Sequence, residues 1–245
     1  MKKIALVTGG LGGLGTAMCK TLSKSGHVVV TTYSGNEEKK INWQNRAKAE
    51  GFEFTAYLCD VANYESCADV VAKIKQDFGG INILVNNAGI TRDGTLKKMT
   101  KESWDAVIDT NLSSLFNMTK HVLDDMLEKS WGRIINISSI NGQKGQFGQA
   151  NYSAAKSGVH GFTMAVAQEV AKKGITVNTI APGYIATDMV MSVPDEIRNK
   201  IISCIPLGRL GSPDEIAALV NYLASDASGF MTGAELAING GQHMM

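Results

Sequence analysis

Residues 8–15 read Thr-Gly-Gly-Leu-Gly-Gly-Leu-Gly, and they join an apolar segment, Lys3–Thr8, to a segment of helical pattern, Leu14–Ser25. The apolar segment is typical of a buried strand, and Gly26 is a stop signal for the helix. Glycine at such a junction lets the backbone approach a pyrophosphate, while the helix N-terminus offers free N–H groups and the positive end of its dipole. A glycine turn alone is also typical of a plain structural bend. Its place at the first strand–helix junction favours a dinucleotide site.

Strand-like and helix-like segments alternate outward from this turn. We predict strands at Lys3–Thr8, Val28–Tyr33, Glu53–Tyr57, Ile81–Val85, Arg133–Ile137, Thr176–Ile180 and Ala234–Ile238. We predict helices at Leu14–Ser25, Glu37–Glu50, Tyr64–Phe78, about Lys101–Lys129, Tyr152–Ala171 and Asp214–Ala224. Strands separated by helices pair in parallel, and strands that are apolar on both faces are covered on both sides. The sequence therefore predicts a single α/β domain, residues 1–245, with a Rossmann-type doubly wound parallel β-sheet of about seven strands and helices on both faces.

One segment, at about 184–210, breaks this alternation. It is long, contains Pro194 and Pro206, and follows the carboxyl end of a predicted strand. Loops in that place cover ligands in open α/β sheets. We therefore predict that this segment is a lid.

Composition argues against several classes of protein. The chain has 245 residues, 44% of them hydrophobic, which is enough for a sizeable core. Its net charge of +1 indicates neither nucleic acid nor an anionic membrane as a partner. We find no signal-peptide pattern and no apolar run that could span a bilayer. The four cysteines, at 19, 59, 67 and 204, lack metal-ligand spacing, which predicts no metal site and reduced thiols in a cytoplasmic protein.

The end of the second predicted strand distinguishes NAD from NADP. Proteins that bind NAD commonly place a carboxylate there, about 20 residues past the glycines, to bond the ribose 2′-hydroxyl. The stretch Thr31–Gly35 has no carboxylate. Ser34 can donate a hydrogen bond to a 2′-phosphate, and Lys39 or Lys40 can supply the counter-charge. The two glutamates just before Lys39 oppose this reading if they point inward, yet the pattern favours NADP.

Polar and small residues follow the third and fourth predicted strands. Asp60, which precedes Val61, can accept a hydrogen bond from an adenine amino group. The stretch Asn86–Gly89 includes small residues that let a flat ribose and adenine lie against the sheet edge. Asn, Asp and Gly are also common in turns that bind nothing. Their repeated placement at the carboxyl ends of strands favours contact with a ligand.

Tyr152 and Lys156 are four residues apart at the start of a predicted helix, so they share one face. An ammonium beside a phenol lowers the pKa of the tyrosine, which suits a proton donor to a nascent alkoxide. The pair alone is unspecific. However, Ser139 ends the fifth predicted strand, where its hydroxyl can bond a substrate oxygen. Asn111 can close a proton relay to water through its side-chain amide, or it can simply cap a neighbouring backbone group.

The sequence resembles the short-chain dehydrogenase/reductase superfamily over essentially its whole length. The motifs that carry the resemblance are Thr8-Gly9-x3-Gly13-x-Gly15, Asn86–Gly89, Asn111, Ser139, Tyr152-x3-Lys156 and Pro182–Gly183. The resemblance implies NADPH or NADP⁺ as cofactor, a homotetramer, and a catalytic tetrad of Asn111, Ser139, Tyr152 and Lys156. It places Thr187 on the nicotinamide carboxamide and Lys156 on the ribose hydroxyls. Further implied cofactor contacts are Gly9, Gly12, Gly13, Leu14, Gly15, Asn87, Ala88, Gly89, Ile90, Tyr152, Pro182, Gly183 and Ile185.

Longer matches resemble one branch, the bacterial acetoacetyl-CoA reductases, which make (R)-3-hydroxybutyryl-CoA for polyhydroxybutyrate synthesis. These matches lie at 89–93, 104–111, 141–149, 182–190 and 239–244. The branch implies an acyl-CoA thioester, acetoacetyl-CoA, as substrate. It implies an acyl and pantetheine path lined by Asp93, Gln146, Phe147, Gly148, Gln149, Gly183 and Tyr184, beside Ser139 and Tyr152. The chain departs from the branch at Met191–Pro194, which lacks basic side chains for the CoA phosphates, so Arg198 and Lys200 are the expected replacements.

Two other functions remain open from the sequence. A 3-oxoacyl-[acyl-carrier-protein] reductase of fatty-acid synthesis resembles this chain in fold and tetrad. Such enzymes often place a basic residue where this chain has Ser130, although Lys129 and Lys173 are nearby. A non-catalytic nucleotide-sensing module is the third reading, since common folds serve many functions. A sensor does not need Tyr152 and Lys156, so their presence favours an enzyme.

Overall fold

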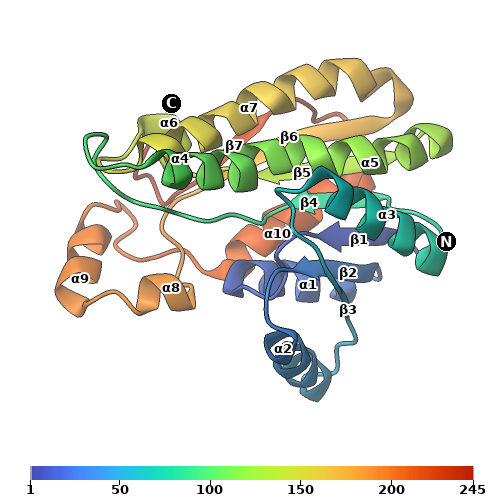
Figure 1. Cartoon of the computed structure of the whole chain (residues 1–245), viewed down its shortest axis with the longest axis horizontal. Coiled ribbons are helices and arrows are strands. Elements are labelled where there is room, and N and C mark those ends of the chain that lie inside the picture. The colour runs from blue at the N-terminus through green and yellow to red at the C-terminus, as the bar shows by residue number, and fades with distance from the viewer. Residues whose placement is uncertain (1, 245) are drawn as a thin grey trace.

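One parallel sheet organises residues 2–244, the part of the chain that the computed structural model describes (Figure 1). Its strands run in the order β3-β2-β1-β4-β5-β6-β7, and every neighbouring pair is parallel. The strands are β1 Ile4–Val7, β2 Val28–Tyr33, β3 Thr55–Leu58, β4 Ile83–Asn86, β5 Gly132–Ile137, β6 Ile175–Pro182 and β7 Glu235–Ile238. The predicted Rossmann-type α/β fold with about seven strands is confirmed.

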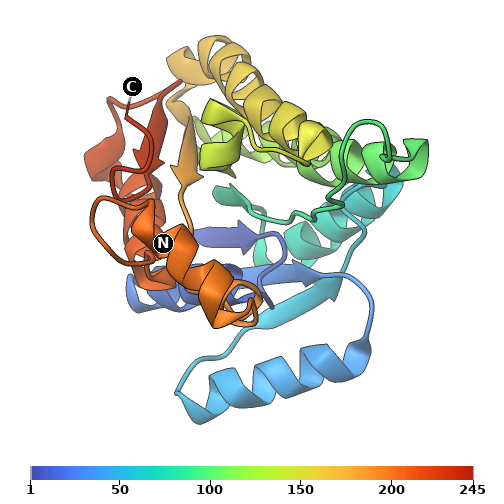
Figure 2. The ribbon, with the colours of Figure 1, turned by 90° about the vertical axis from the view of Figure 1, so that its left-hand side faces the viewer.

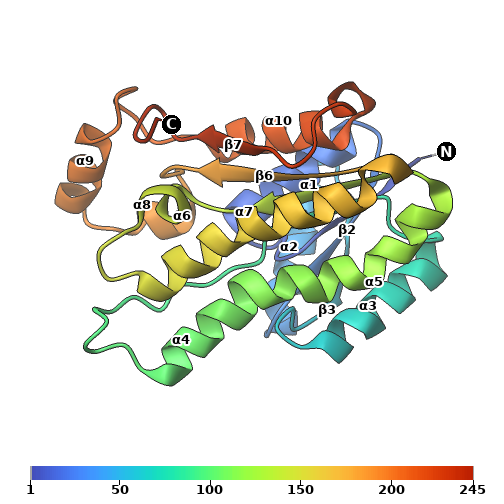
Figure 3. The same ribbon diagram turned by 90° about the horizontal axis from the view of Figure 1, so that it is seen from above.

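Helices cover both faces of this sheet (Figure 3). One face carries α3 Tyr64–Phe78, α5 Ser114–Lys129 and α7 Ala150–Val170. The other carries α1 Gly13–Lys24 and α10 Pro213–Ala224. The helix α2, Glu37–Ala49, lies beside the β3 end of the sheet, and α4, Lys101–Ile108, precedes α5 (Figure 1). None of the helices in residues 2–244 is long and apolar enough to cross a membrane.

The central strands are buried on both faces because their side chains alternate between two cores. Ala5 and Val7 of β1 pack into the core on the side of α1 and α10. Leu6, between them, packs into the core on the side of α3 and α5. All three are fully buried, and burial of one large apolar side chain contributes about 1.5–3 kcal/mol. The strand period of two residues therefore explains why β1 is apolar throughout.

The chain changes its direction of winding at β1. This strand pairs with β2 on one side and with β4 on the other. The connections that leave β1 and β3 therefore lead to opposite sides of β1, and they diverge at the carboxyl ends of the strands. Ligands of open α/β sheets bind in the crevice that such a divergence leaves. Figure 2 views the molecule from this side, with the segment that follows β6 in front.

Several short elements differ from the prediction. The predicted helix at about 101–129 consists of α4, a π-helical turn at Asp109–Ser113, and α5. A short helix, α6 Ile140–Lys144, follows β5. The predicted lid at 184–210 contains two helices, α8 Asp188–Met191 and α9 Asp195–Ser203. These helices are only four to nine residues long, so they carry too little periodicity to be recognised in the sequence.

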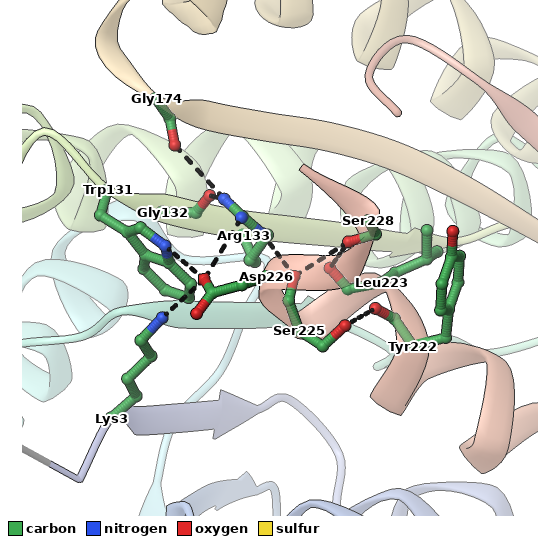
Figure 4. A network of polar contacts seen from close by, with 10 residues as sticks. All are labelled: Lys3, Trp131, Gly132, Arg133, Gly174, Tyr222, Leu223, Ser225, Asp226 and Ser228. Atoms are coloured by element: carbon green, nitrogen blue, oxygen red, sulfur yellow. Dashed lines mark hydrogen bonds and ion pairs between the residues drawn. The ribbon is translucent and has the colours of Figure 1, made fainter. Parts of the chain in front are cut away.

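A polar network closes the amino-terminal edge of the sheet, away from the crevice (Figure 4). The buried Arg133 side chain donates to three backbone carbonyls. These are Gly132 at 2.8 Å, Ser225 at 3.1 Å and Gly174 at 3.3 Å. The exposed Asp226 carboxylate accepts from Trp131 Nε1 at 3.0 Å and from Lys3 Nζ at 3.2 Å. The network joins β1, β5 and the segments that precede β6 and follow α10.

Candidate active site

A cavity of about 270 Å³ lies at the carboxyl edge of the sheet. Ser139 reaches it from the end of β5, Tyr152 and Lys156 from α7, and Pro182 from the end of β6. The cavity shares wall residues with a hollow along the glycine turn, and that hollow shares others with a hollow against α2. The residues predicted to contact the cofactor line one of these three spaces, with the exception of Lys40, the alternative to Lys39. The fold therefore brings segments from both halves of the chain into one crevice.

The glycine turn has the geometry that a close approach of a ligand requires. Gly9 has a φ of +67°, where a side chain would be strained. A Cβ atom on Gly15 would lie 2.6 Å from the carbonyl oxygen of Gly9. Gly12 is the N-cap of α1, and within residues 2–244 no side chain caps this end and no acidic residue lies in its first turn. The exposed N–H groups and the helix dipole therefore suit an anion such as a pyrophosphate.

Thr8 and Asn87 join the ends of β1 and β4 beneath the turn. Thr8 Oγ1 accepts from the backbone N–H groups of Asn87, at 2.9 Å, and Ala88, at 3.0 Å. Asn87 Nδ2 donates to the carbonyl oxygen of Thr8 at 2.9 Å. The role of Thr8 in positioning Asn87 was not predicted from the sequence. A hydroxyl at a strand end beside the glycine turn is the signal that would have indicated it.

The hollow against α2 is basic. It is lined by Ser34, Lys39 and Arg46, and the last two are seven residues apart on one face of α2. Arg46 was not predicted to line this hollow, although its spacing of seven residues from Lys39 indicates a shared helix face. The prediction that Lys40 could supply the counter-charge is wrong, because its ammonium is paired with the carboxylate of Glu37. That carboxylate also accepts from the Tyr33 hydroxyl, so it is occupied on both sides.

Asp60 and Val61 line the hollow between these regions, at the end of β3. Asp60 Oδ1 accepts from the backbone N–H of Ala62 at 3.0 Å, which fixes the turn. The carbonyl oxygen of Val61 accepts from Asn117 Nδ2 at 3.0 Å, inside the protein. The loop is therefore held from α5, and it presents Asp60, the predicted adenine contact, and Val61 to the crevice.

Tyr152 is half-buried, and its phenol lies beside the hydroxyl of Ser139. Burial raises the pKa of the Tyr152 phenol, the nearby Asp93 charge raises it further, and the bond to Ser139 opposes both. Ser139 is also the N-cap of α6, since its Oγ accepts from the backbone N–H of Asn141 at 3.1 Å. The phenol is therefore protonated at neutral pH, which is the state that a proton donor needs.

Lys156 is fully buried, and burial lowers its pKa to about 8. Its Nζ donates to the carbonyl oxygen of Ile137 at 2.7 Å and lies 5.7 Å from the centre of the Tyr152 ring. The prediction that Lys156 lowers the Tyr152 pKa differs from what we find, since that pKa is raised. The reason is that burial of the phenol dominates, while the amine is turned to Ile137. Ser138 Oγ donates to the Lys156 carbonyl at 2.7 Å and anchors this turn of α7 to β5.

Asn111 lies in the π-helical turn and is fully buried. Its Oδ1 accepts from the backbone N–H of Ile90 at 2.8 Å, and its Nδ2 donates to the carbonyl oxygen of Ile90 at 2.7 Å. These two bonds use one lone pair of Oδ1 and one hydrogen of Nδ2, so the relay of a proton to water through the side-chain amide stays a prediction. The alternative reading, a residue that caps neighbouring backbone, describes these contacts. Asn111 holds Ile90, which lines the cavity.

The residues predicted for the substrate fall into two groups. Gly183 and Tyr184 line the cavity, as does Gln149. Gln146 and Phe147 do not: both are exposed on the loop after α6, and Phe147 is 86% exposed. Gly148 and Asp93 also lie outside the cavity wall. Asp93 bonds to Gln149 instead, which the sequence did not reveal.

The segment at 184–210, for which a lid is predicted, contributes Thr187, Met189 and Val190 to the cavity wall. The expectation that Arg198 replaces missing basic residues is not supported by its contacts. Its guanidinium bonds to Asp195 Oδ1 at 2.5 Å and to two backbone carbonyls, so it ties α9 to the preceding turn. Lys200 is exposed on α9 and lines none of the spaces described above.

Comparison with known proteins agrees with this geometry. The family model for short chain dehydrogenases matches residues 3–198. An acetoacetyl-CoA reductase of Cupriavidus necator is 55% identical over 243 residues, which cover 99% of each chain. Nodulation protein G of Azospirillum brasilense is 58% identical, over 98% of each chain. A 3-oxoacyl-[acyl-carrier-protein] reductase of Pseudomonas aeruginosa is 46% identical, over 99% of this chain and 98% of the relative. The chain therefore belongs to the short chain dehydrogenase family.

Proposed function

We propose that this protein is an NADPH-dependent acetoacetyl-CoA reductase, which forms (R)-3-hydroxybutyryl-CoA for polyhydroxybutyrate synthesis. The observation that carries the proposal is the cavity in which Ser139, Tyr152 and Lys156 meet at the end of the glycine-lined crevice. Acetoacetyl-CoA reductases that are 47–55% identical over nearly the full length support the choice of substrate. The sensor reading loses its support, since these relatives are enzymes.

The residues of the cavity can move and stabilise a proton at the substrate carbonyl. The bound nicotinamide would supply the hydride. Tyr152 donates its proton to the carbonyl oxygen, which becomes the hydroxyl of the product. Ser139, whose Oγ already accepts from Asn141, has its hydroxyl hydrogen available to the same oxygen. Lys156 stabilises the phenolate that remains and is placed to hold ribose hydroxyls, for which its amine must leave Ile137.

The preference for NADPH rests on the hollow against α2. Lys39 and Arg46 offer two positive charges, and Ser34 offers a hydroxyl, at the place where a ribose 2′-phosphate would lie. Glu37, the carboxylate that could have bound a ribose hydroxyl instead, is paired with Lys40 and Tyr33. The site residues present therefore fit a phosphorylated cofactor.

We also infer a cytoplasmic homotetramer. Support for the tetramer comes from large apolar side chains that are exposed on helices, among them Phe116 on α5 and Met164 on α7. Support for the cytoplasm comes from the four cysteines, which are all free thiols. Reducing compartments keep thiols in this state.

The experiment follows the oxidation of NADPH and NADH with acetoacetyl-CoA as substrate, in the wild type and in Lys39→Ala. We expect rapid turnover with NADPH and little with NADH. Loss of Lys39 should raise the KM for NADPH by about tenfold, since a charge-assisted bond contributes about 1.5–3 kcal/mol, and leave NADH unaffected. Lys48→Ala, on the same helix but outside the hollow, is the matched control. Equal use of both cofactors by the wild type would refute the NADPH assignment.

The same experiment tests the alternative function, reduction of a substrate bound to acyl-carrier protein. The 46% identical 3-oxoacyl-[acyl-carrier-protein] reductase of Pseudomonas aeruginosa is the observation that favours testing it. If the protein reduced acetoacetyl-carrier protein but not acetoacetyl-CoA, its function would be in fatty-acid synthesis. Ser130, where such enzymes often carry a basic residue, leads us to expect the opposite preference.

A further inference from the structure

We infer that Asp93, Gln149 and Asn141 form a positioning chain that fixes the orientation of the Ser139 hydroxyl beside Tyr152. The inference rests on the proposed function and assigns these residues a role other than contact with the substrate. Asp93 comes from the loop between β4 and α4, Gln149 from the N-terminus of α7, and Asn141 from α6. Three segments that surround the cavity are thus joined through side chains.

The contacts can be followed from Asp93 at the rim of the cavity to Ser139 at the reacting centre. Gln149 Nε2 donates to Asp93 Oδ2 at 2.9 Å. Asn141 Nδ2 donates to Gln149 Oε1 at 2.9 Å. The backbone N–H of Asn141 donates to Ser139 Oγ at 3.1 Å. Asn141, which is only 8% exposed, therefore connects the side chains of Asp93 and Gln149 to the Ser139 hydroxyl, which lies beside Tyr152.

The chemistry of Asp93 sets the orientation of the two amide side chains, Gln149 and Asn141. A carboxylate can only accept hydrogen bonds, whereas an amide presents a donor at one end and an acceptor at the other. Gln149 must therefore turn its Nε2 to Asp93 and its Oε1 to Asn141. Asn141 must in turn present its Nδ2 to Gln149. With its lone pair engaged by Asn141, Ser139 directs its hydrogen toward the cavity.

The loop that carries Asp93 is held in place without the Asp93 side chain. Gly94 N donates to the carbonyl oxygen of Gly148 at 2.8 Å. The fully buried Asn151 donates through its Nδ2 to the carbonyl oxygens of Arg92, at 3.1 Å, and Ser103, at 3.2 Å. Replacement of Asp93 should therefore leave the loop docked on α7, so that a variant reports on the chain and not on unfolding.

Asp93 also acts on Tyr152 through its charge. The other titratable groups of the cavity wall are Lys156, on the same helix, and Tyr184, after β6. Burial raises the pKa of Tyr152 and that of Tyr184, and the charge of Asp93 raises both further. Reduction needs a protonated Tyr152, so activity declines as pH rises through its pKa. Removal of the Asp93 charge lowers that pKa, and the decline should begin at a lower pH.

The test compares Asp93→Ala and Asp93→Asn with Asp105→Asn, an exposed acid on α4 that pairs with Lys101. Asp93→Ala breaks the chain, and we expect kcat with acetoacetyl-CoA to fall by about tenfold, with KM little changed, because misplaced groups slow the chemical step. Asp93→Asn can still accept from Gln149, so its loss in kcat should be smaller. Both variants should shift the alkaline limb of the kcat profile to lower pH, and Asp105→Asn should not.

A double variant shows whether the residues act as one chain. Asp93→Ala combined with Gln149→Ala should lower kcat no more than Gln149→Ala alone, because residues of one network are not additive. Additive losses would overturn the inference. A rise in KM with unchanged kcat would also overturn it, because it would make Asp93 a substrate contact.

Hydrogen exchange measured by mass spectrometry gives a readout that needs no substrate. Exchange over residues 140–149 should accelerate in Asp93→Ala, while exchange over α10 should not change. If the wild-type protein fails to reduce acetoacetyl-CoA, the proposed function is wrong. The exchange result then tests by itself whether Asp93, Gln149 and Asn141 form a positioning chain. Unchanged exchange over residues 140–149 would overturn the inference in either case.

Discussion

Lys156 and Tyr152 are buried side by side, and their ionisation is coupled to the stability of the fold. Burial lowers the pKa of Lys156 to about 8 from its ordinary value of 10.5. It raises the pKa of Tyr152. Both shifts favour the neutral form, since a low dielectric opposes charge. The apoprotein therefore holds a neutral acid next to an amine that loses its proton within the physiological range.

Replacement of Tyr152 by phenylalanine removes the proposed proton donor and little volume. We expect kcat for acetoacetyl-CoA to fall by at least about 10²-fold, since general acids contribute that much. NADPH binding, followed by fluorescence, should stay close to that of the wild type. Tyr222→Phe, on the exposed side of α10, is the matched control. Near-normal turnover of Tyr152→Phe would remove the phenol from the mechanism.

Replacement of Lys156 by methionine should stabilise the protein at neutral pH. Between pH 8 and 10.5 the folded wild type binds fewer protons at Lys156 than the unfolded chain, so its stability rises with pH. Below pH 8 the buried charge of Lys156 destabilises the folded wild type by on the order of 3 kcal/mol. The net gain of Lys156→Met is smaller than this, because the variant also loses the hydrogen bond to Ile137. Urea unfolding should show that the advantage of Lys156→Met at pH 7 shrinks at pH 10. An advantage that is equal at both pH values would contradict this assignment.

At the scale of single elements, Arg133 links β5 to the segments that precede β6 and follow α10. Its guanidinium donates to three backbone carbonyls, and its bond to Gly132 is buried, whereas the carboxylate of Asp226 is 79% exposed. Loss of the donor removes a buried hydrogen bond and two partly buried ones, although the Ser225 carbonyl still accepts from Ser228 Oγ. Loss of an exposed partner charge costs little by comparison. The two residues of one ion pair should therefore differ in their effect on stability.

We expect Arg133→Met to lower the free energy of unfolding by about 2–4 kcal/mol. Asp226→Asn should lower it by less than about 1 kcal/mol, because its Oδ1 can still accept from Trp131. Chemical denaturation at neutral pH measures both. If the two variants lost the same stability, the ion pair and not the carbonyl contacts would hold this edge.

The long elements were predictable from the sequence, and the contacts between segments were not. The residue bounds of β2 and α3 coincide with the prediction, because β-branched runs and a helix with clear start and stop signals identify themselves. The hydrogen bonds of Asn111 to Ile90, and of Gln149 to Asp93, join residues 21 and 56 positions apart. Periodicity gives no information at such separations, so the motifs could be recognised in the sequence, whereas the pairing of each amide with its distant partner could not.

At the scale of the whole molecule, several large apolar side chains on or beside the helices remain exposed. Tyr64 of α3 and Phe116 of α5 stack at 6.0 Å between ring centres, and Phe116 is 52% exposed. Phe230, before β7, and Met164 of α7 are exposed elsewhere. Large exposed apolar side chains that gather on helices mark surfaces for association. These are the faces through which we expect four copies to assemble.

The size of the particle in solution tests this assembly. Light scattering after gel filtration should give a tetramer for the wild type. Phe116→Glu should yield smaller species, since a charge opposes burial at an interface. Ile41→Glu, on an exposed face of α2, should leave the tetramer intact. A wild-type monomer would refute the proposed assembly.

The π-helical turn at Asp109–Ser113 has a consequence for the phase of the helix that contains it. Such a turn adds one residue to a regular α-helix, and one residue corresponds to a rotation of about 100° about the axis. Deletion of a single residue there would let the hydrogen bonds run as one regular helix from Lys101 to Lys129. It would also rotate the apolar face of α4 away from α7 and carry Asn111 out of reach of Ile90. The extra residue therefore rotates α5 relative to α4 about their common axis, so that the two consecutive helices can face different neighbours.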